Sequence, residues 1–221
     1  MPFAETAALQ ERLRADLLAG AGPETLLFCE HEPVVTLGRS ARPANVLASA
    51  AELARRGVTV AAASRGGDVT YHGPGQLVGY PVVRLRGGVV GHMTAMARAI
   101  ARVLDQLGIA ASFRRDAPGL WTNDEKVCAF GVHVRSRVAI HGFALNVTTD
   151  LRAFDLIVPC GLSGVRTTSL ARRGVKPPPL ASLAASIAGE LGVELGAEFI
   201  EERMSFDRIA MPDGITRMDR A

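Results

Sequence analysis

The hydrophobic positions of this chain follow the period of helices in some stretches and the alternation of strands in others. Leucines within residues 5–18 return on one side of a helix, while charged side chains lie mostly elsewhere. The strongest helical period covers residues 92–107 and ends at Gly108. Two further helices are predicted at residues 48–56 and 180–191.

Short apolar runs predict the strands of the same chain, at residues 26–29, 34–37, 58–63, 77–85, 126–134 and 138–147. The run at 58–63 is expected to be a buried strand, and Pro81 should place the run at 77–85 at a sheet edge or at a bulge. Arg135 and Ser136 form a connection of hairpin length, which favours an antiparallel pair around them. Helices mixed with hairpin-linked strands indicate an α+β fold rather than a doubly wound sheet.

Length and composition favour one domain that spans residues 1–221. The chain is 48% hydrophobic, which is enough for a substantial core, and no Pro/Gly/Ser linker divides it into halves. No run of about 18 apolar residues predicts a membrane span. The first 20 residues lack the apolar block of a signal peptide. We therefore expect a cytoplasmic protein without membrane association.

Charge and cysteine content bear on the classes of partner and site. The net charge of +3 comes from dispersed basic residues without interleaved aromatics, which disfavours nucleic acid and would suit an acidic protein partner. A generic solvated surface explains that charge equally well. The three cysteines, Cys29, Cys128 and Cys160, are too few for a disulfide scaffold, and none has the spacing of a zinc site. We expect no metal and no cofactor.

A polar segment at residues 65–76 is rich in glycine and in groups that bind ligands. Its glycines let the backbone turn tightly and approach a ligand closely. Arg65, Tyr71 and His72 add a cation, an aromatic ring and an imidazole. The segment does not match the phosphate-binding pattern GxxxxGK followed by Ser or Thr, so it does not imply a nucleotide site. A binding loop and a long structural turn both explain these residues.

Two reactive side chains stand in distinctive local sequences. Cys160 lies between Pro159 and Gly161 after an apolar run, as expected of a turn. Gly161 leaves room for a substrate, and its amide could help to stabilise an oxyanion. Lys126 opens an apolar strand. These residues alone are also compatible with an inert buried thiol and with a lysine that caps the start of the strand at the surface.

Four ordered blocks of the chain resemble the lipoyl(octanoyl) transferases. They are EHEPVVTLGR at residues 30–39, RGGDVTYHGPGQ at 65–76, HGFALNV at 141–147 and the run at 154–161 that ends in Pro-Cys-Gly. The second and third blocks are specific, and the Pro-Cys-Gly turn carries the cysteine that separates this family from its relatives. The resemblance covers about residues 30–170, which is most of the chain.

The resemblance implies a single domain of the biotin/lipoate protein ligase catalytic-domain type, with a mixed sheet flanked by helices. The family-like core would cover about residues 25–195, and a tail would follow at about 200–221. Cys160 would carry the acyl group as a thioester, and Lys126 would lower the pKa of its thiol. The implied substrate contacts are Arg65, Gly66, Gly67, Asp68, Val69, Thr70, Tyr71, His72, Ala129, Phe130, Gly131, Gly142, Phe143 and Ala144.

The implied reaction moves an octanoyl group from octanoyl-acyl carrier protein to a specific lysine of a lipoyl domain, in lipoate biosynthesis. The acceptors would be lipoyl domains of 2-oxoacid dehydrogenase complexes and the glycine cleavage H protein. A free thiol has a pKa of about 8.5 and is only a few per cent thiolate near neutrality, and a nearby ammonium favours the thiolate. Cys160 and Lys126 are 34 residues apart, so the fold must bring them together.

One local departure and three other functions stay open. After Lys126 the sequence is Val-Cys-Ala-Phe-Gly, where the family usually has a small residue and then Ile or Leu before the Gly, so Cys128 and Phe130 leave the shape of the pocket wall open. An ATP-dependent lipoate or biotin ligase would need an adenylate site and no nucleophilic cysteine. A non-catalytic acyl-binding protein would not need Lys126 and Cys160 together. A cysteine hydrolase that pairs Cys160 with a histidine would release free acid.

Overall fold

A computed structural model describes residues 1–161, 164–202 and 215–220; for residue 160 and for residues 200–202 and 215–217 the description concerns the backbone alone. The helices are α1 (Phe3–Ala19), α2 (Ala50–Arg55), α3 (Val89–Gln106) and α4 (Leu180–Leu195), with the 3-10 turns η1 (Pro43–Asn45), η2 (Leu151–Leu156) and η3 (Pro159–Gly161). The strands are β1 (Thr25–Cys29), β2 (Val34–Leu37), β3 (Thr59–Ala62), β4 (Val69–His72), β5 (Gln76–Arg84), β6 (Ser112–Arg114), β7 (Gly119–Thr122), β8 (Glu125–Arg135), β9 (Val138–Asn146), β10 (Arg166–Thr167), β11 (Phe199–Glu202) and β12 (Ile215–Arg220).

Within the described ranges the strands form two sheets. The large sheet has nine strands in the order β11-β12-β1-β5-β9-β8-β7-β6, with β10 attached to β8. Its neighbours are antiparallel except for β10, which runs parallel to β8. The small sheet has the order β3-β2-β4, with β2 parallel to β3 and antiparallel to β4. This mixed sheet with flanking helices confirms the predicted fold class.

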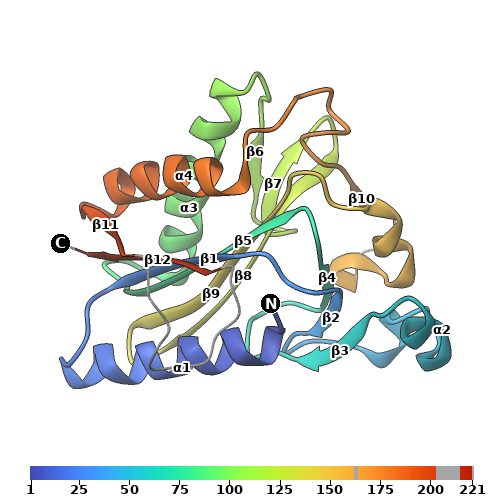
Figure 1. Ribbon diagram of the computed structural model, residues 1–221, viewed down its shortest axis with the longest axis horizontal. Coiled ribbons are helices and arrows are strands. Elements are labelled where there is room, and N and C mark those ends of the chain that lie inside the picture. The colour runs from blue at the N-terminus through green and yellow to red at the C-terminus, as the bar shows by residue number, and fades with distance from the viewer. Residues whose placement is uncertain (162–163, 203–214, 221) are drawn as a thin grey trace.

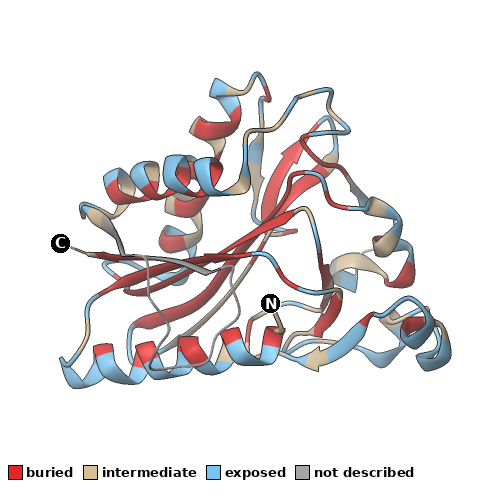
Figure 2. Ribbon diagram, viewed as in Figure 1, coloured by how far each residue is buried: buried red, intermediate tan, exposed pale blue. Residues whose placement is uncertain are grey.

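Helices cover both faces of the large sheet (Figure 1). On one face α1 packs Leu9, Leu13 and Leu17 against apolar side chains of β5 and β9. On the other face α3 and α4 form the larger core cluster, which includes Met96 and Ile100. Figure 2 shows that the buried positions gather along the sheet and on the helix faces turned toward it. Each fully buried Leu or Met side chain contributes about 1.5–3 kcal/mol to folding, so these two layers hold the sheet in place.

The four predicted helices are confirmed, with ends that differ by a few residues. α1 ends where Gly20 adopts a left-handed conformation with φ of +73°. α2 starts later than predicted because Ser49 caps it, its side chain accepting a hydrogen bond from the Glu52 amide. No helix in the described part of the chain is both long and apolar enough to cross a membrane.

Two strand predictions were wrong about position within a sheet. Residues 58–63 were expected to be buried, but β3 is a largely exposed edge strand of the small sheet. Pro81 was expected at an edge or a bulge, yet β5 lies in the interior between β1 and β9. The ladder to β9 is interrupted around Pro81. In this stretch His141 has φ of +60° and donates its amide proton to Gln10 of α1 at 2.7 Å, so the interruption leaves that amide satisfied.

The connection between β8 and β9 confirms the predicted antiparallel pair. Ser136 and Arg137 have φ of +49° and +63°, and two successive positive values are typical of the tight hairpin turns that match strand twist. The polar segment at 66–75 was predicted as a loop throughout, but it contains β4, which pairs with β2. Only its two ends are therefore loops.

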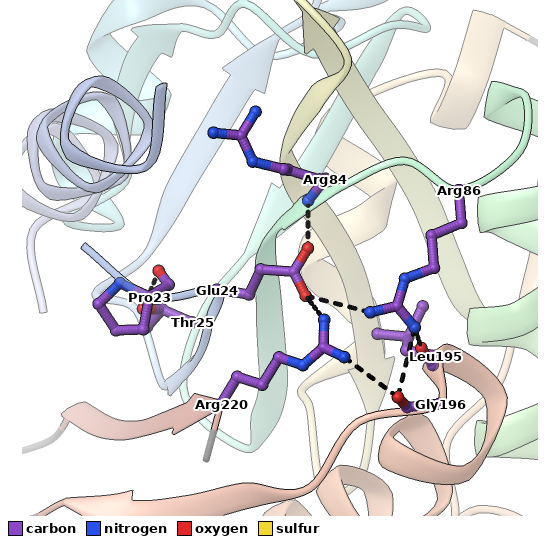
Figure 3. Close-up of polar contacts among 8 residues, drawn as sticks. All are labelled: Pro23, Glu24, Thr25, Arg84, Arg86, Leu195, Gly196 and Arg220. Atoms are coloured by element: carbon purple, nitrogen blue, oxygen red, sulfur yellow. Dashed lines mark hydrogen bonds and ion pairs between the residues drawn. The ribbon is translucent and has the colours of Figure 1, made fainter. Parts of the chain in front are cut away.

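Glu24, just before β1, ties the last described strand to the rest of the sheet (Figure 3). Its carboxylate accepts hydrogen bonds from the Arg84 amide at 2.8 Å and from the Arg220 guanidinium at 2.8 Å. Arg220 also donates to the carbonyl of Gly196, the residue that ends α4, at 3.3 Å. Glu24 is only 9% exposed, so salt screens this ion pair less than it would a surface pair. The cluster joins β5, β12 and the end of α4.

Candidate active site

A cavity of about 370 Å³ lies between β4, the middle of the large sheet and the first residues of α1 and α3. Thirteen of the fourteen residues expected to contact substrate line it: Arg65, Gly66, Gly67, Asp68, Val69, Thr70, His72, Ala129, Phe130, Gly131, Gly142, Phe143 and Ala144. The remaining one, Tyr71, turns away and packs edge-on against Phe154, with ring centroids 5.7 Å apart. The predicted substrate contacts from residues 65–72, 129–131 and 142–144 therefore meet around one space, although they lie far apart along the chain.

The cavity also has walls that no sequence motif indicated. Phe3 of α1 and Met93 of α3 line it, as do Ala117 and Pro118 just before β7. Phe3 stacks on the imidazole of His72, with the rings 3° from parallel and their centroids 6.2 Å apart. In the sequence these residues look like ordinary core positions at the ends of elements, so only the folded arrangement reveals them as walls of the cavity.

Arg65 holds the glycine-rich loop in one conformation. Its Nη1 donates to the Asp68 carbonyl at 2.8 Å, and its Nη2 donates to the carbonyl and the hydroxyl of Thr36 at 2.7 and 2.8 Å. The Gly38 amide donates to the Asp68 carbonyl at 3.1 Å from the other side. A side chain at residue 38 would overlap the Gly67 carbonyl. The loop can lie this close to the end of β2 because Gly38 has no side chain. The loop is therefore preorganised beside the cavity.

Polar side chains link the cavity to the backbone beside Lys126. His72 Nδ1 lies 2.8 Å from Gln76 Oε1, Gln76 donates to Asn146 Oδ1 at 2.9 Å, and Asn146 donates to the Thr168 carbonyl at 3.0 Å. The Thr168 amide in turn donates to the Lys126 carbonyl at 2.9 Å. Burial lowers the pKa of His72 well below its ordinary value, so the imidazole is neutral near pH 7. This series of hydrogen bonds therefore fixes the positions of the side chains beside the cavity and does not provide a general acid.

A β-bulge determines which side of the sheet Lys126 reaches. The register between β7 and β8 shifts between Lys126 and Cys128, which leaves Val127 as an extra residue. Val127 and Cys128 both belong to the core cluster, while Lys126 and Ala129 line the same recess on the cavity side. In a regular strand Lys126 would share the core face with Cys128, because side chains alternate. The bulge therefore turns Lys126 toward the candidate site.

Lys126 is only 3% exposed, and an aromatic ring and a carbonyl lie beside its ammonium. Its Nζ is 5.0 Å from the centroid of the Trp121 ring, which is within the range of a cation–π interaction. The Pro118 carbonyl accepts a hydrogen bond from the same Nζ at 3.4 Å. Trp121 Nε1 donates to the Ala117 carbonyl at 3.1 Å, so the ring is itself fixed.

The structure brings Lys126 close to the turn that carries Cys160. Lys126 and Pro159 line a common recess of about 10 Å³, and Cys160 follows Pro159 in η3. The side chain of Cys160 lies outside the described part of the structure. The recess adjoins the main cavity, because Thr70, Ala129 and Ala144 line both.

The other two cysteines are poorly suited to attack a substrate. Burial raises the pKa of Cys29 to about 12, and it raises the pKa of Cys128 further. The side chain of Cys128 lies in the core cluster and does not line the cavity, whereas Phe130 does. The unusual Cys128 therefore leaves the cavity wall unchanged, and the unusual Phe130 shapes it.

Comparison with known proteins finds a family model and curated relatives that match most of this chain. The model of the lipoyl protein ligase A/B catalytic domain matches residues 2–192. An octanoyltransferase of Chloroflexus aurantiacus is 45% identical over 86% of this chain and 89% of its own length. Another, from Geobacter metallireducens, is 40% identical over 96% of this chain and 95% of its own.

Solved structures show the same fold at low identity. A lipoate-protein ligase A bound with ATP superposes with a TM-score of 0.70 at 16% identity, over 89% of this chain and 85% of the other. A bipartite lipoate protein ligase from Thermoplasma acidophilum superposes with a TM-score of 0.65 at 18% identity, over 89% of this chain and 83% of the other.

Proposed function

We propose that this chain, which belongs to the octanoyltransferases of the lipoyl protein ligase A/B catalytic-domain family, takes an octanoyl group from one protein substrate, holds it on Cys160 and passes it to a second. The chain is an acyltransferase that moves an octanoyl group in lipoate biosynthesis. This membership favours transfer over the ligase, acyl-binding and hydrolase alternatives. The donor in the proposal is octanoyl-acyl carrier protein, and the acceptor is a lysine of a lipoyl domain. Its setting is the cytoplasm.

One observation carries the assignment of residues. Lys126, which is buried, lines one recess together with Pro159, the neighbour of Cys160, and this recess lies beside a largely apolar cavity. The cavity suits the hydrocarbon tail of the substrate. At about 0.8 kcal/mol for each buried CH₂, an eight-carbon chain would gain roughly 4–6 kcal/mol there. Val78, Phe130 and Phe143 supply apolar wall. The reacting end of the octanoyl group would then lie in the recess, beside the dyad of Lys126 and Cys160.

In the first half-reaction the Cys160 thiolate attacks the carbonyl carbon of the carrier thioester. The new carbon–sulfur bond forms on Cys160, and the bond to the carrier sulfur breaks. The Lys126 ammonium gives its proton to the departing thiolate, so the carrier leaves as a neutral thiol and Lys126 is left neutral. One thioester replaces another, and the step is therefore nearly balanced in energy without ATP.

In the second half-reaction the lysine amine of the acceptor attacks the octanoyl thioester on Cys160. The amide bond forms, the bond to the Cys160 sulfur breaks, and neutral Lys126 takes the proton that the amine loses. Cys160 leaves as a thiolate beside the restored ammonium, which favours it. The dyad is thereby returned to its starting state after one transfer.

The proposal is tested by mixing the protein with octanoyl-acyl carrier protein and following intact mass on rapid quenching. We expect an adduct heavier by one octanoyl group, mapped to Cys160, that is consumed when acceptor domain is added alone. Rates measured with both substrates varied should give parallel double-reciprocal lines, as ping-pong transfer requires. Intersecting lines with no adduct would mean direct transfer between the substrates, and the role of Cys160 would have to be withdrawn.

A further inference from the structure

A segment outside all the sequence motifs supports the turn that carries Cys160. The Val158 amide donates to the Asn45 carbonyl at 2.8 Å, and Val46 forms an isolated antiparallel bridge with Ile157. Asn45 ends η1, and Val158 comes directly before η3. The backbone that leads into η3 is therefore paired with the backbone that leaves η1.

A carboxylate joins this segment to the glycine-rich loop. Asp68 Oδ2 accepts a hydrogen bond from Asn45 Nδ2 at 2.5 Å, while Asp68 Oδ1 accepts from the amides of Val69 and Arg42 at 2.8 and 3.1 Å. Three donors thus converge on one carboxylate, and two of them come from the η1 segment. The loop is fixed in turn by Arg65, which donates to the Asp68 carbonyl. Asp68 is held by backbone and side-chain donors together.

The last residue of η3 lies directly against this pair. Gly161 has φ of +65°, a left-handed conformation that favours glycine. A Cβ at Gly161 would overlap Asp68 Oδ2 and would lie 3.0 Å from Asn45 Nδ2. The turn is therefore in contact with this segment on both sides of Cys160. The Asn45 carbonyl binds the residue before the turn, and the Asp68–Asn45 pair packs against Gly161, which follows Cys160.

We infer that Asp68 and Asn45 are positioning residues for the nucleophile: their carboxylate–amide pair fixes the backbone of residues 159–161, and with it the place of the thiol at the cavity. This inference rests on the proposed role of Cys160. It assigns a role to Asn45, which no motif indicated, and it gives Asp68 a task other than the substrate contact implied by the resemblance. A misplacement of about 1 Å at a reacting group can slow a reaction about 100-fold, so small shifts of this turn matter.

The pair can be broken and rebuilt by exchanging its two side chains. In Asn45→Asp two carboxylates face each other where a donor met an acceptor, and we expect the rate of Cys160 acylation at saturating donor to fall about 100-fold. Adding Asp68→Asn restores one donor and one acceptor, so the double variant should recover to within about tenfold of the wild type. Asn45→Ala, which removes the donor without adding charge, should be slowed about tenfold. In the two single Asn45 variants the KM for octanoyl-acyl carrier protein should change little, because Asn45 does not line the cavity.

Two controls separate this inference from its alternatives. Asn123→Asp makes the same chemical change at an exposed turn and should acylate like the wild type, and thermal unfolding shows whether each variant is folded. The rate at which iodoacetamide alkylates Cys160 is followed in parallel by peptide mass, because it does not depend on the transfer reaction. Normal acylation and alkylation in Asn45→Asp, or a folded double variant no better than Asn45→Asp, would overturn the positioning role of Asp68 and Asn45. If the wild type forms no acyl-enzyme, the proposed function fails, and the alkylation rates alone then decide whether the pair positions Cys160.

Discussion

The large and the small sheet contribute to the candidate site by different means. Lys126 belongs to a long strand inside the large sheet, and a single extra residue, Val127, sets the direction of its side chain. Cys160 belongs to neither sheet but to a 3-10 turn, which is supported by segments that adjoin the small sheet. Local strand geometry is thus enough to aim the lysine. The turn depends on contacts with segments that lie far away in the sequence, around Asn45 and Asp68.

The largest loss of activity is expected from changes in the turn that carries Cys160. Replacing Cys160 with Ala or Ser should abolish the octanoyl adduct and the transfer reaction, because no other thiol is placed to take the acyl group. The fold should persist, since residue 160 lies in the short turn η3 rather than in a helix or strand. Intact mass and circular dichroism measure the two effects.

Cys128→Ala is the matched control for this experiment and should still form the adduct, because Cys128 lies in the core rather than at the cavity. An adduct on the Cys160→Ala variant that the acceptor consumes would show that another thiol is the nucleophile. Cys128 would then be the first residue to examine.

A smaller but still large loss is expected on the side of the large sheet. Lys126→Arg keeps the positive charge but cannot give up a proton at neutral pH, so amide formation from the acyl-enzyme should slow about 100-fold or more. Single-turnover transfer from isolated acyl-enzyme to acceptor measures this step. Lys176→Arg, at an exposed position, is the matched control and should be unaffected. Wild-type transfer by Lys126→Arg would leave Lys126 with an electrostatic role only.

The smallest expected effect concerns the pH dependence of stability and leaves catalysis unchanged. His92 lies on α3 over the large sheet and does not line the cavity, and burial lowers its pKa to about 4. In the unfolded chain the pKa of this histidine is about 6.5. Between about pH 6.5 and pH 4 the unfolded chain therefore binds more protons than the folded protein, so the free energy of unfolding falls as the pH falls. His92→Gln should remove about 2 kcal/mol of the stability lost between pH 7 and pH 5. Urea unfolding at both pH values measures this difference.

Transfer at pH 7 should be unchanged in His92→Gln, because His92 lines neither the cavity nor the recess beside Lys126. A variant that loses as much stability on acidification as the wild type would assign the acid sensitivity to other buried histidines, such as His31 and His141, whose pKa values burial lowers to about 4 and about 3.

The helices could be predicted because an amphipathic period is a local property of the sequence. Strand placement could not, because neighbours in a sheet are set by the whole fold. β3 is apolar but sits at an exposed edge, and Pro81 stands in an interior strand whose ladder is interrupted around it. The short strands β6 and β10 carry too few residues to show any period.

The same distinction applies to the candidate site. Motif residues such as Arg65 and Phe143 could be found because they stand in dense, distinctive blocks. Asn45 lies in an unremarkable polar stretch, and Phe3 resembles any core residue at the start of a helix. Alternation along β8 would even have put Lys126 on the wrong face, since a one-residue bulge leaves no mark on composition.

The ring beside Lys126 also gives this protein an optical label of its own. Trp121 is the single tryptophan of the chain, so all indole fluorescence originates within 5.0 Å of the Lys126 ammonium. The Arg114 guanidinium lies over the same ring at 4.6 Å, which adds a constant charge against which a change at Lys126 stands out. In the proposed mechanism Lys126 loses its ammonium proton in the first half-reaction and regains it in the second. Each change alters the electric field at the indole, so we expect the emission of Trp121 to follow both half-reactions in real time without any dye.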